Sequence, residues 1–348
     1  MHASVVKTMS ASGAERSAPR PAMRRAFGGR VALKLMALAV LASPMATKAQ
    51  EYPTKPVRVV VAFAPGSATD TVGRVYGQKV SELLGQPVII ENKPGAVGII
   101  GADSVAKSAP DGYTLLVGTN TTNAAVRALM KNVPYDPEKD FTPISFLGAL
   151  PQVVIVNNDL PIKTLPDLIN HARANPDKLS YAWTSSVTRV AAEMLGSMAK
   201  VKFFNVPYKT GSSAIADVIS GQVNFTIVDM IVALPQIKGG KVRALAVTSP
   251  QRVTQLPEIP TVAEAGNLPG YEILGIFAAF GPANLPQPIV NRLNQAILKA
   301  GQDPELRNRF ESMGLKVETS SPEQLRARFA AERVSWGKVA TESGITPQ

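Results

Sequence analysis

Short apolar runs that alternate with helix-like segments constrain the fold of this chain more than any other feature. Val57–Phe63 has the near-continuous apolar character of a buried strand, and Val72–Leu84 carries apolar residues at helical spacing until Gly85 ends it. A second strand is predicted at Val88–Glu91. Strands and helices in this order favour an α/β fold, with a mostly parallel sheet and helices on both of its faces.

The same alternation starts again near Pro151, so the sequence predicts two α/β lobes. We expect residues 50–151 to form the first part of lobe 1, residues 152–277 to form lobe 2, and residues 278–348 to complete lobe 1 with C-terminal helices. Further strands are predicted at Tyr113–Val117, Val153–Val156, Lys178–Ala182, Val223–Val228, Val242–Thr248 and Tyr271–Gly281. Further helices are predicted at Gly98–Ser108, Thr121–Met130, Leu165–Ala174, Val187–Ala199, Ser212–Ser220, Pro288–Ala300, Pro304–Met313 and Pro322–Glu342.

Residues 1–49 have the order of an export signal. Arg24, Arg25 and Arg30 precede the apolar run Val31–Ala42, and small residues follow up to Ala49. The apolar run is well short of the ~20 residues that span a membrane. We therefore expect removal of this segment after Ala49 and a location in the periplasm.

Two details concern the route and the start of this signal. Met23–Phe27 contains part of a twin-arginine pattern, but Gly28 and Gly29 depart from it, so the general secretory (Sec) route is favoured. The polar stretch Met1–Ala22 is unusual for a signal, which makes Met23 an alternative translation start.

Removal of the signal changes what the charge implies. The chain has a formal net charge of +11, but the signal holds 8 of the 37 basic residues and 1 of the 26 acidic residues. The other 29 basic and 25 acidic residues give +4 without a basic cluster, which argues against nucleic acid as a partner. The absence of cysteine excludes disulfides, thiolate nucleophiles and cysteine-ligated metals.

The junction after the first strand has the chemistry of an anion site. Small residues and hydroxyls follow in the order Ala64-Pro65-Gly66-Ser67-Ala68-Thr69-Asp70. The first N–H groups of the next helix, with the hydroxyls of Ser67 and Thr69, offer a seat for a carboxylate or phosphate. A plain helix cap explains the same residues, because Ser, Thr and Asp are preferred N-cap residues. Asp70 would repel an anion, so capping the helix or holding an amine or a water suits it better.

Three other strand ends carry small polar residues or an acid. They are Thr119-Asn120-Thr121-Thr122, Trp183-Thr184-Ser185-Ser186 and Asp229. Ligands of open α/β sheets bind beyond the carboxyl ends of strands, so we expect these residues to converge on one cleft. A helix cap is an equal explanation for Asp229.

The sequence argues against an enzyme and predicts no cofactor or metal. His171 is the single histidine of residues 50–348, and it lies in a polar helix without a predicted partner, so a Ser-His-Asp triad is disfavoured. The chain has no Gly-x-Ser-x-Gly elbow. Gly95, Gly98 and Gly101 lack the Gly-x-Gly opening of a dinucleotide loop, and no acidic cluster is spaced like a calcium loop.

Several motifs, taken in one order, resemble those of a known family. They are Tyr52-Pro53-Thr54-Lys55-Pro56, Glu91-Asn92-Lys93-Pro94-Gly95-Ala96, Ala109-Pro110-Asp111-Gly112-Tyr113, Val206-Pro207-Tyr208-Lys209, Ala233-Leu234-Pro235-Gln236-Ile237-Lys238, Arg243-Ala244-Leu245-Ala246-Val247-Thr248 and Pro257-Glu258-Ile259-Pro260-Thr261. From Tyr52 to about Trp336, the chain resembles the Bug-type periplasmic solute receptors, the binding components of tripartite tricarboxylate transporters.

The resemblance implies a two-lobe periplasmic-binding-protein fold of the Venus-flytrap, type II-like kind, which closes on a small carboxylate. It implies that the loop Ala64–Asp70 is the first anion loop, and that Thr119 follows its strand as in the family. Tyr208 and Asp229 fall in matching motifs, which places them at the cleft. The chain departs from the family at 182–189, where a glycine-rich segment is usual and Trp183 and Arg189 stand instead.

These departures raise two further hypotheses. Arg189 has the geometry to pair with a ligand carboxylate, or it is a solvated arginine on the first turn of a helix. Trp183 is suited to stack on an aromatic or unsaturated acid, or it packs between the lobes. We expect a monomeric receptor that delivers a small organic anion to the membrane subunits of a tripartite tricarboxylate transporter. The alternative is a sensor that presents its bound form to a membrane sensor kinase.

Overall fold

The computed structural model describes Ala18 and residues 52–347. The predicted export signal at residues 1–49 lies outside the described residues, apart from Ala18. No helix among the described residues is both long and apolar enough to cross a membrane.

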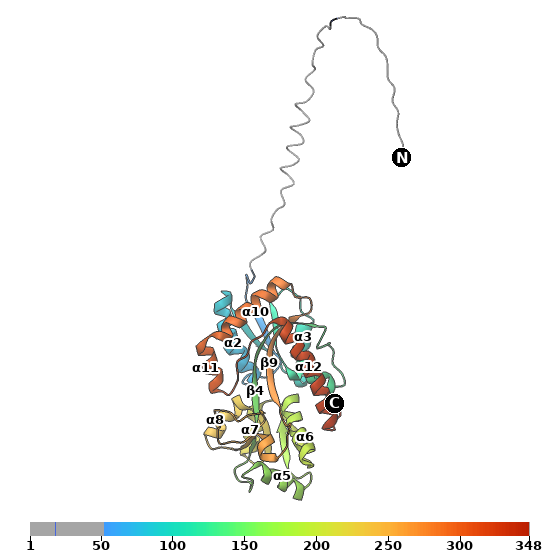
Figure 1. Cartoon of the computed structure of the whole chain (residues 1–348), viewed down its shortest axis with the longest axis vertical. Helices are drawn as coiled ribbons and strands as arrows, with labels where there is room; N and C mark the ends of the chain where they lie inside the picture. Colours follow the sequence, from blue (N-terminus) through green and yellow to red (C-terminus); the bar gives the residue numbers. More distant parts are fainter. Residues whose placement is uncertain (1–17, 19–51, 348) are drawn as a thin grey trace, which may run out of the picture. The chain divides into compact units, whose positions relative to one another are not determined.

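The first sheet combines three parallel strands with two long antiparallel ones. β1 (Val57–Val61) lies between β2 (Val88–Asn92) and β3 (Thr114–Thr119), parallel to both. β9 (Leu274–Pro282) runs antiparallel to β3, and β4 (Phe141–Val156) runs antiparallel to β9. The strand order is β2-β1-β3-β9-β4, so a strand from late in the chain lies between β3 and β4 (Figure 1).

The second sheet is built on the other half of β4. β7 (Phe225–Asp229) pairs antiparallel with β4 from Gln152 onward, and β5 (Ser180–Trp183) and β6 (Phe204–Pro207) continue the sheet in parallel. β8 (Arg243–Val247) pairs with the same half of β4. β4 therefore runs through both sheets and changes its partners between Pro151 and Gln152.

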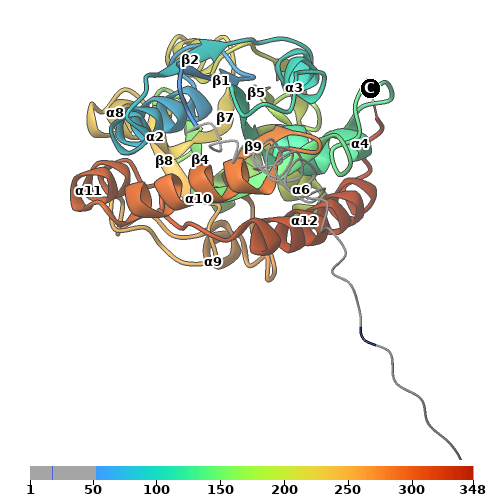
Figure 2. The ribbon, with the colours of Figure 1, turned by 90° about the horizontal axis from the view of Figure 1, so that it is seen from above.

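Helices pack against both sheets. In Figure 2, α10 and α12 lie along one side near β4, in agreement with their contacts to that strand. The helical segments are α2 (Ala68–Leu84), η1 (Ala96–Gly98), α3 (Ile99–Ala106), η2 (Thr121–Ala125), α4 (Val126–Leu129), α5 (Leu165–Ala174), α6 (Ser186–Ala199), α7 (Gly211–Ile219), α8 (Met230–Lys238), α9 (Val262–Gly266), α10 (Gln287–Gln302), α11 (Pro304–Ser312) and α12 (Pro322–Glu342).

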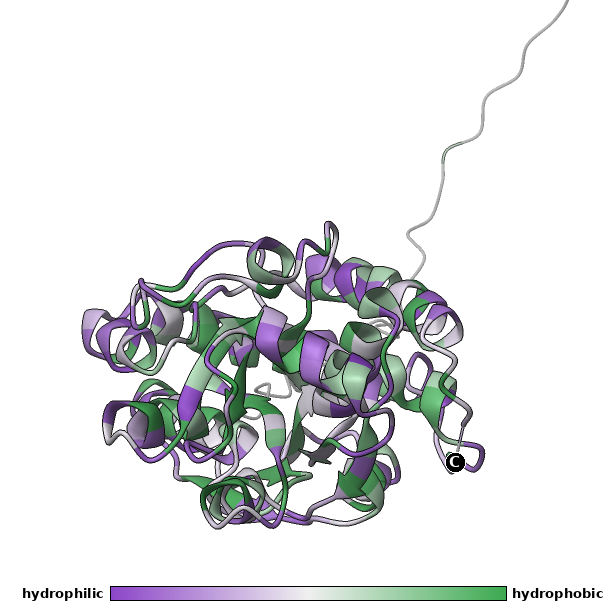
Figure 3. Ribbon diagram, turned by 90° about the horizontal axis from the view of Figure 1, so that it is seen from below, coloured by the Kyte–Doolittle hydropathy of each residue, from purple (hydrophilic) through white to green (hydrophobic). Residues whose placement is uncertain are grey.

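The core of the unit Glu51–Gln348 consists of two clusters of buried apolar side chains. Neighbouring residues of β4, such as Val154 and Ile155, belong to different clusters because successive side chains of a strand point to opposite faces. Figure 3 shows apolar residues on the strands and hydrophilic residues along the outer turns of the helices. Helices thus bury both faces of the central strands, whereas the edge strands β2 and β6 keep exposed residues.

The alternation of strands and helices agrees with the prediction, and the differences lie where prolines and irregular turns occur. The sequence predicted only Val153–Val156 of β4, because Pro143 and Pro151 are unusual within a strand. β4 accommodates Pro143 next to a register shift in its pairing with β9. The predicted helix Thr121–Met130 begins with a π-helical turn, η2. Because β4 and β9 join the strands by antiparallel pairs, each sheet is mixed rather than mostly parallel. The lobe boundaries remain predictions.

Candidate ligand-binding site

Four helices begin at one cavity of about 50 Å³. The N-cap residues of α2, α6, α7 and α8 are Ser67, Ser185, Thr210 and Asp229, and all four line it. The first two helices follow β1 and β5, and α8 follows β7 directly, so strand ends from both sheets bring these turns together. The volume suffices for about four water molecules at roughly 10–15 Å³ each.

Side-chain caps fix the first turns of three of these helices. The Ser67 Oγ accepts from the Asp70 N–H at 3.2 Å, the Ser185 Oγ from the Thr188 N–H at 3.4 Å, and the Thr210 Oγ1 from the Ser213 N–H at 3.1 Å. The Ser67 hydroxyl keeps a proton that is suited to a ligand oxygen, whereas the Thr210 Oγ1 lies 2.8 Å from the Ser213 Oγ and the Ser185 Oγ lies 3.4 Å from the Thr188 Oγ1. The first N–H groups of each helix have no intrahelical acceptor and carry a partial positive charge, so their convergence favours an anion.

The polar floor of the cavity contains Asn120 and Asp229. Asn120 is 1% exposed; its Nδ2 donates to the Leu274 carbonyl at 2.8 Å, and its Oδ1 has no partner among the described residues. The Asp229 Oδ1 accepts from the Gln152 Nε2 at 3.0 Å, and burial raises the pKa of the Asp229 carboxyl. Gly275 permits this arrangement, because a Cβ there would lie 3.0 Å from the Gln152 Nε2.

Lys209 is the single cation among the described residues that line this cavity, and Asp229 is the single acid. Lys209 is exposed and also lines a second, larger cavity. Sequence reasoning missed Lys209, Thr210 and Gly211 as site residues. The signal was present, because a hydroxyl followed by a small residue opens α7 as Ser67 and Ala68 open α2.

The second cavity, of about 560 Å³, adjoins the first. The two share Phe63, Thr184, Lys209 and Thr210 as lining residues. The other lining residues are Ala62, Ala64, Pro94, Gly95, Ala96, Val97, Gly98, Trp183, Pro207 and Tyr208.

Most residues predicted to bind ligand line one of the two cavities. Ser67, Ala68, Thr69, Thr119, Asn120, Thr184, Ser185 and Asp229 line the first. Ala64, Trp183 and Tyr208 line the second, where Thr184 recurs. Asp70, Ser186 and Arg189 line neither.

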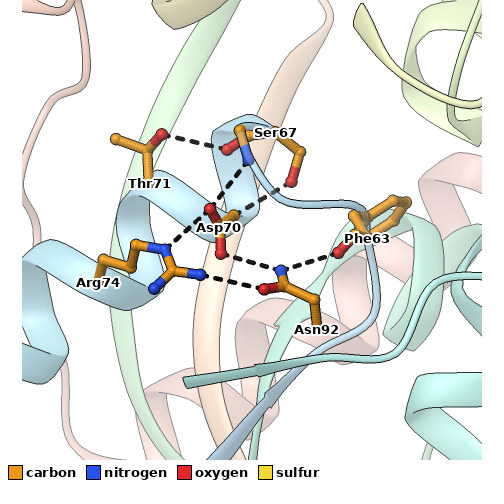
Figure 4. A network of polar contacts seen from close by, with 7 residues as sticks. Phe63, Ser67, Asp70, Thr71, Arg74 and Asn92 are labelled. Atoms are coloured by element: carbon orange, nitrogen blue, oxygen red, sulfur yellow. Dashed lines mark hydrogen bonds and ion pairs between the residues drawn. The ribbon is translucent and has the colours of Figure 1, made fainter. Parts of the chain in front are cut away.

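Asp70 takes part in a hydrogen-bond network of the loop before α2 and lines neither cavity. Its Oδ2 accepts from the Gly66 N–H at 2.9 Å and from the Arg74 Nε at 3.0 Å, and its Oδ1 accepts from the Asn92 Nδ2 at 2.9 Å (Figure 4). Burial alone would raise the pKa of Asp70, but these hydrogen bonds outweigh it and lower the pKa. The Asn92 Nδ2 also donates to the Phe63 carbonyl at 3.1 Å, so the network holds the loop before α2.

Arg189 and Ser186 lie on the first turn of α6 rather than on a cavity wall. The Arg189 guanidinium carbon lies 5.5 Å from the centroid of the Trp183 ring, so Arg189 supports the indole. Its Nε is buried and has no partner among the described residues. Ser186 is the first residue of α6 and is buried.

The receptor model of the tripartite tricarboxylate transporter family, TctC, matches residues 72–345 of this chain. The chain belongs to this family. The Bug-type resemblance is thereby confirmed. The receptor is 34% identical over 312 residues to protein BugT of Bordetella pertussis, which covers 89% of this chain and 95% of BugT. The family consists of solute-binding receptors and is not an enzyme family.

Two solved structures confirm the periplasmic-binding-protein fold. Rpa4515 of R. palustris with adipate has a TM-score of 0.83 at 34% identity, covering 85% of this chain and all of that chain. The periplasmic binding protein BugD has a TM-score of 0.81 at 32% identity, again covering 85% of this chain and all of BugD. Neither comparison tests which residues of the present receptor contact a ligand, so the individual site residues remain predictions.

Proposed function

We propose that this receptor captures a small organic carboxylate in the periplasm and delivers it to the membrane subunits of a tripartite tricarboxylate transporter. The observation that carries the proposal is the convergence of four helix N-termini, with Lys209, on one small cavity. The structural relative Rpa4515, which has adipate bound, supports the choice of a carboxylate over other anions.

The proposed binding step uses groups from both sheets. The carboxylate accepts hydrogen bonds from the first N–H groups of α2 on one side and of α6 and α7 on the other, with the hydroxyl of Ser67 as a further donor. Asn120 supplies an acceptor for a ligand hydroxyl or for a bridging water.

Closure follows from the position of these groups on two sheets that share β4. A ligand that contacts both sides of the cavity binds the closed arrangement more tightly and shifts the population toward it. Exclusion of water then strengthens each polar contact. The closed receptor is the form that we expect to dock on the transporter.

A panel of matched acids and amides tests the carboxylate. The exported protein is purified, unfolded and refolded to remove any carried ligand, and its melting temperature is measured with each acid and with its neutral amide. We expect a rise with an acid that is lost with its amide, because the amide removes the charge that the helix N-termini stabilise. Equal shifts for an acid and its amide, or no shift with any acid, contradict the proposal.

A further inference from the structure

The residues that line the larger cavity are suited to an apolar, planar group. Phe63, Trp183 and Tyr208 supply three aromatic rings, and Val97 and Pro207 supply aliphatic surface. Binding sites that enclose apolar ligand surface are lined in this way, with few polar groups.

The polar atoms of Trp183 and Tyr208 already have hydrogen-bond partners within the protein. The Trp183 Nε1 donates to the Asn205 Oδ1 at 3.4 Å. The Tyr208 hydroxyl donates to the Asp217 Oδ2 at 2.6 Å, and burial together with this acid raises the pKa of Tyr208 to about 12. Trp183 and Tyr208 therefore offer the cavity apolar ring surface rather than hydrogen-bond donors.

The segment Gly95–Gly98, which contributes Val97 to the lining of the larger cavity, has an uncommon backbone conformation. Four consecutive residues, Gly95 to Gly98, have positive φ angles of 139°, 46°, 54° and 90°. A β-branched residue such as Val97 rarely adopts such an angle, and strain of this kind persists where the surrounding structure and a function require it. A Cβ at Gly98 would lie 3.2 Å from the Phe63 Cζ, so the loop packs closely against the ring.

Within the part of the chain that the structure describes, the larger cavity has no cationic side chain of its own, apart from the shared Lys209, to pair with a second carboxylate. Among the described residues that line it, Lys209 is the single charged side chain, and Lys209 also lines the polar cavity. A carboxylate in the polar cavity would use this cation, and a second carboxylate beyond it would lack a charged partner. Enclosing such a group without a partner is costly.

Resting on the proposed function, we infer that the ligand is a monocarboxylate with an aromatic tail. Its carboxylate occupies the polar cavity at the helix N-termini, and its ring occupies the larger cavity among Phe63, Val97, Trp183 and Tyr208. Arg189 supports the ring contact indirectly by holding the Trp183 indole.

Isothermal titration calorimetry of the refolded receptor with four probes tests whether an aromatic tail increases the affinity of a carboxylate. The probes are 3-phenylpropanoate, propanoate, adipate and 3-phenylpropanamide. We expect 3-phenylpropanoate to bind at least tenfold more tightly than propanoate and adipate, because only it places an aromatic ring against Phe63, Trp183 and Tyr208. We expect 3-phenylpropanamide to bind at least tenfold more weakly than its acid.

A substitution in the lining of the larger cavity tests binding of the aromatic tail separately from binding of the carboxylate. Val97→Asn makes the wall polar, and asparagine tolerates the positive φ of this position, so the variant retains its fold. We expect it to weaken 3-phenylpropanoate at least fivefold and to leave propanoate unchanged. Val334→Asn, at a position 75% exposed and outside both cavities, is the matched control and leaves both affinities unchanged.

The outcomes distinguish the two proposals. Equal affinities for 3-phenylpropanoate and propanoate, or tighter binding of adipate, overturn the aromatic tail and leave the carboxylate site in place. Equal binding of 3-phenylpropanamide and its acid overturns the carboxylate proposal. Absence of binding by all four probes overturns both.

Discussion

Asp70 holds the loop before α2 without lining either cavity. Its carboxylate joins Gly66, Arg74 and Asn92, and through Asn92 it fixes the carbonyl of Phe63, which lines both cavities. The N-cap hydroxyl of Ser67, one turn earlier, remains at the cavity. The position of α2 thus depends on a side chain that faces away from the ligand.

The pH dependence of the free energy of unfolding should report the contribution of the Asp70 hydrogen bonds. Replacement of Asp70 by asparagine removes acceptors for Gly66 and Arg74, so we expect the free energy of unfolding at pH 7 to fall by about 1–3 kcal/mol. The pKa of Asp70 is lowered in the folded state, so its stabilisation is present above the unfolded pKa of ~3.9 and is lost as the pH falls through the folded value. Urea unfolding at pH 7 and at pH 3 should therefore show the difference between wild type and variant shrinking in acid.

Asp177→Asn provides the control for Asp70→Asn, because Asp177 is exposed and asparagine accepts its positive φ of 57°. We expect it to leave the unfolding free energy unchanged at both pH values. A pH-independent difference for Asp70→Asn would assign its effect to packing instead of charge.

Lys209 is the residue whose charge most directly concerns the ligand. We expect Lys209→Gln to weaken binding of a carboxylate about three- to tenfold. A charged hydrogen bond contributes roughly 1.5–3 kcal/mol, and the exposure of Lys209 to water reduces that value. Titration calorimetry measures the change, with Lys241→Gln, exposed and outside both cavities, as the control. Unchanged affinity in Lys209→Gln would remove this cation from the site.

At the scale of elements, the first turns of α2, α6, α7 and α8 form the site. The sequence predicted three of these helices, because strand, small polar residue and helix follow one another locally, but of their caps it considered only the one in the Ser67–Asp70 loop. The sequence already disfavoured Asp70 as an anion contact, because an acid repels a carboxylate, but it could not give the direction in which this side chain points. α8 was missed, because Pro235 within it is unusual for a helix.

The loop Gly95–Gly98 is the element whose backbone sets the wall of the larger cavity. Gly98→Ala places a Cβ 2.8 Å from the Thr122 Cγ2 at a φ of +90°, so we expect a loss of about 2 kcal/mol or more from clash and strain together. Gly270→Ala, at a φ of +84° in open space, isolates the strain and should cost about 1 kcal/mol. Thermal unfolding compares the two, and equal losses would contradict a crowded wall.

At the scale of the molecule, both sheets depend on β4, and the site lies where strand ends from both sheets meet. Parallel strands could be predicted from local apolar runs, but the order β3-β9-β4 could not. It depends on pairing between residues more than 120 positions apart, such as Thr119 with Phe277 and Pro151 with Leu274, and on no local pattern.

Closure should change the dimensions of the receptor in solution. If the ligand contacts α2 on one side and α6 and α7 on the other, saturating ligand draws the two sheets together, and we expect a smaller radius of gyration by X-ray scattering. The neutral amide of the same ligand is the control and should leave the radius unchanged. A radius that stays constant with a tightly bound acid would show that capture proceeds without closure.

β9 is synthesised late, and this limits when the first sheet can form. β3 and β4 do not pair with each other, and the strand that bridges them, Leu274–Pro282, leaves the ribosome only after about four fifths of the chain. Until then the first sheet has a gap one strand wide, so a nascent chain cannot complete either its hydrogen-bonded core or its cavity floor, where Asn120 bonds to Leu274. The first sheet can therefore be completed only after most of the chain has been synthesised.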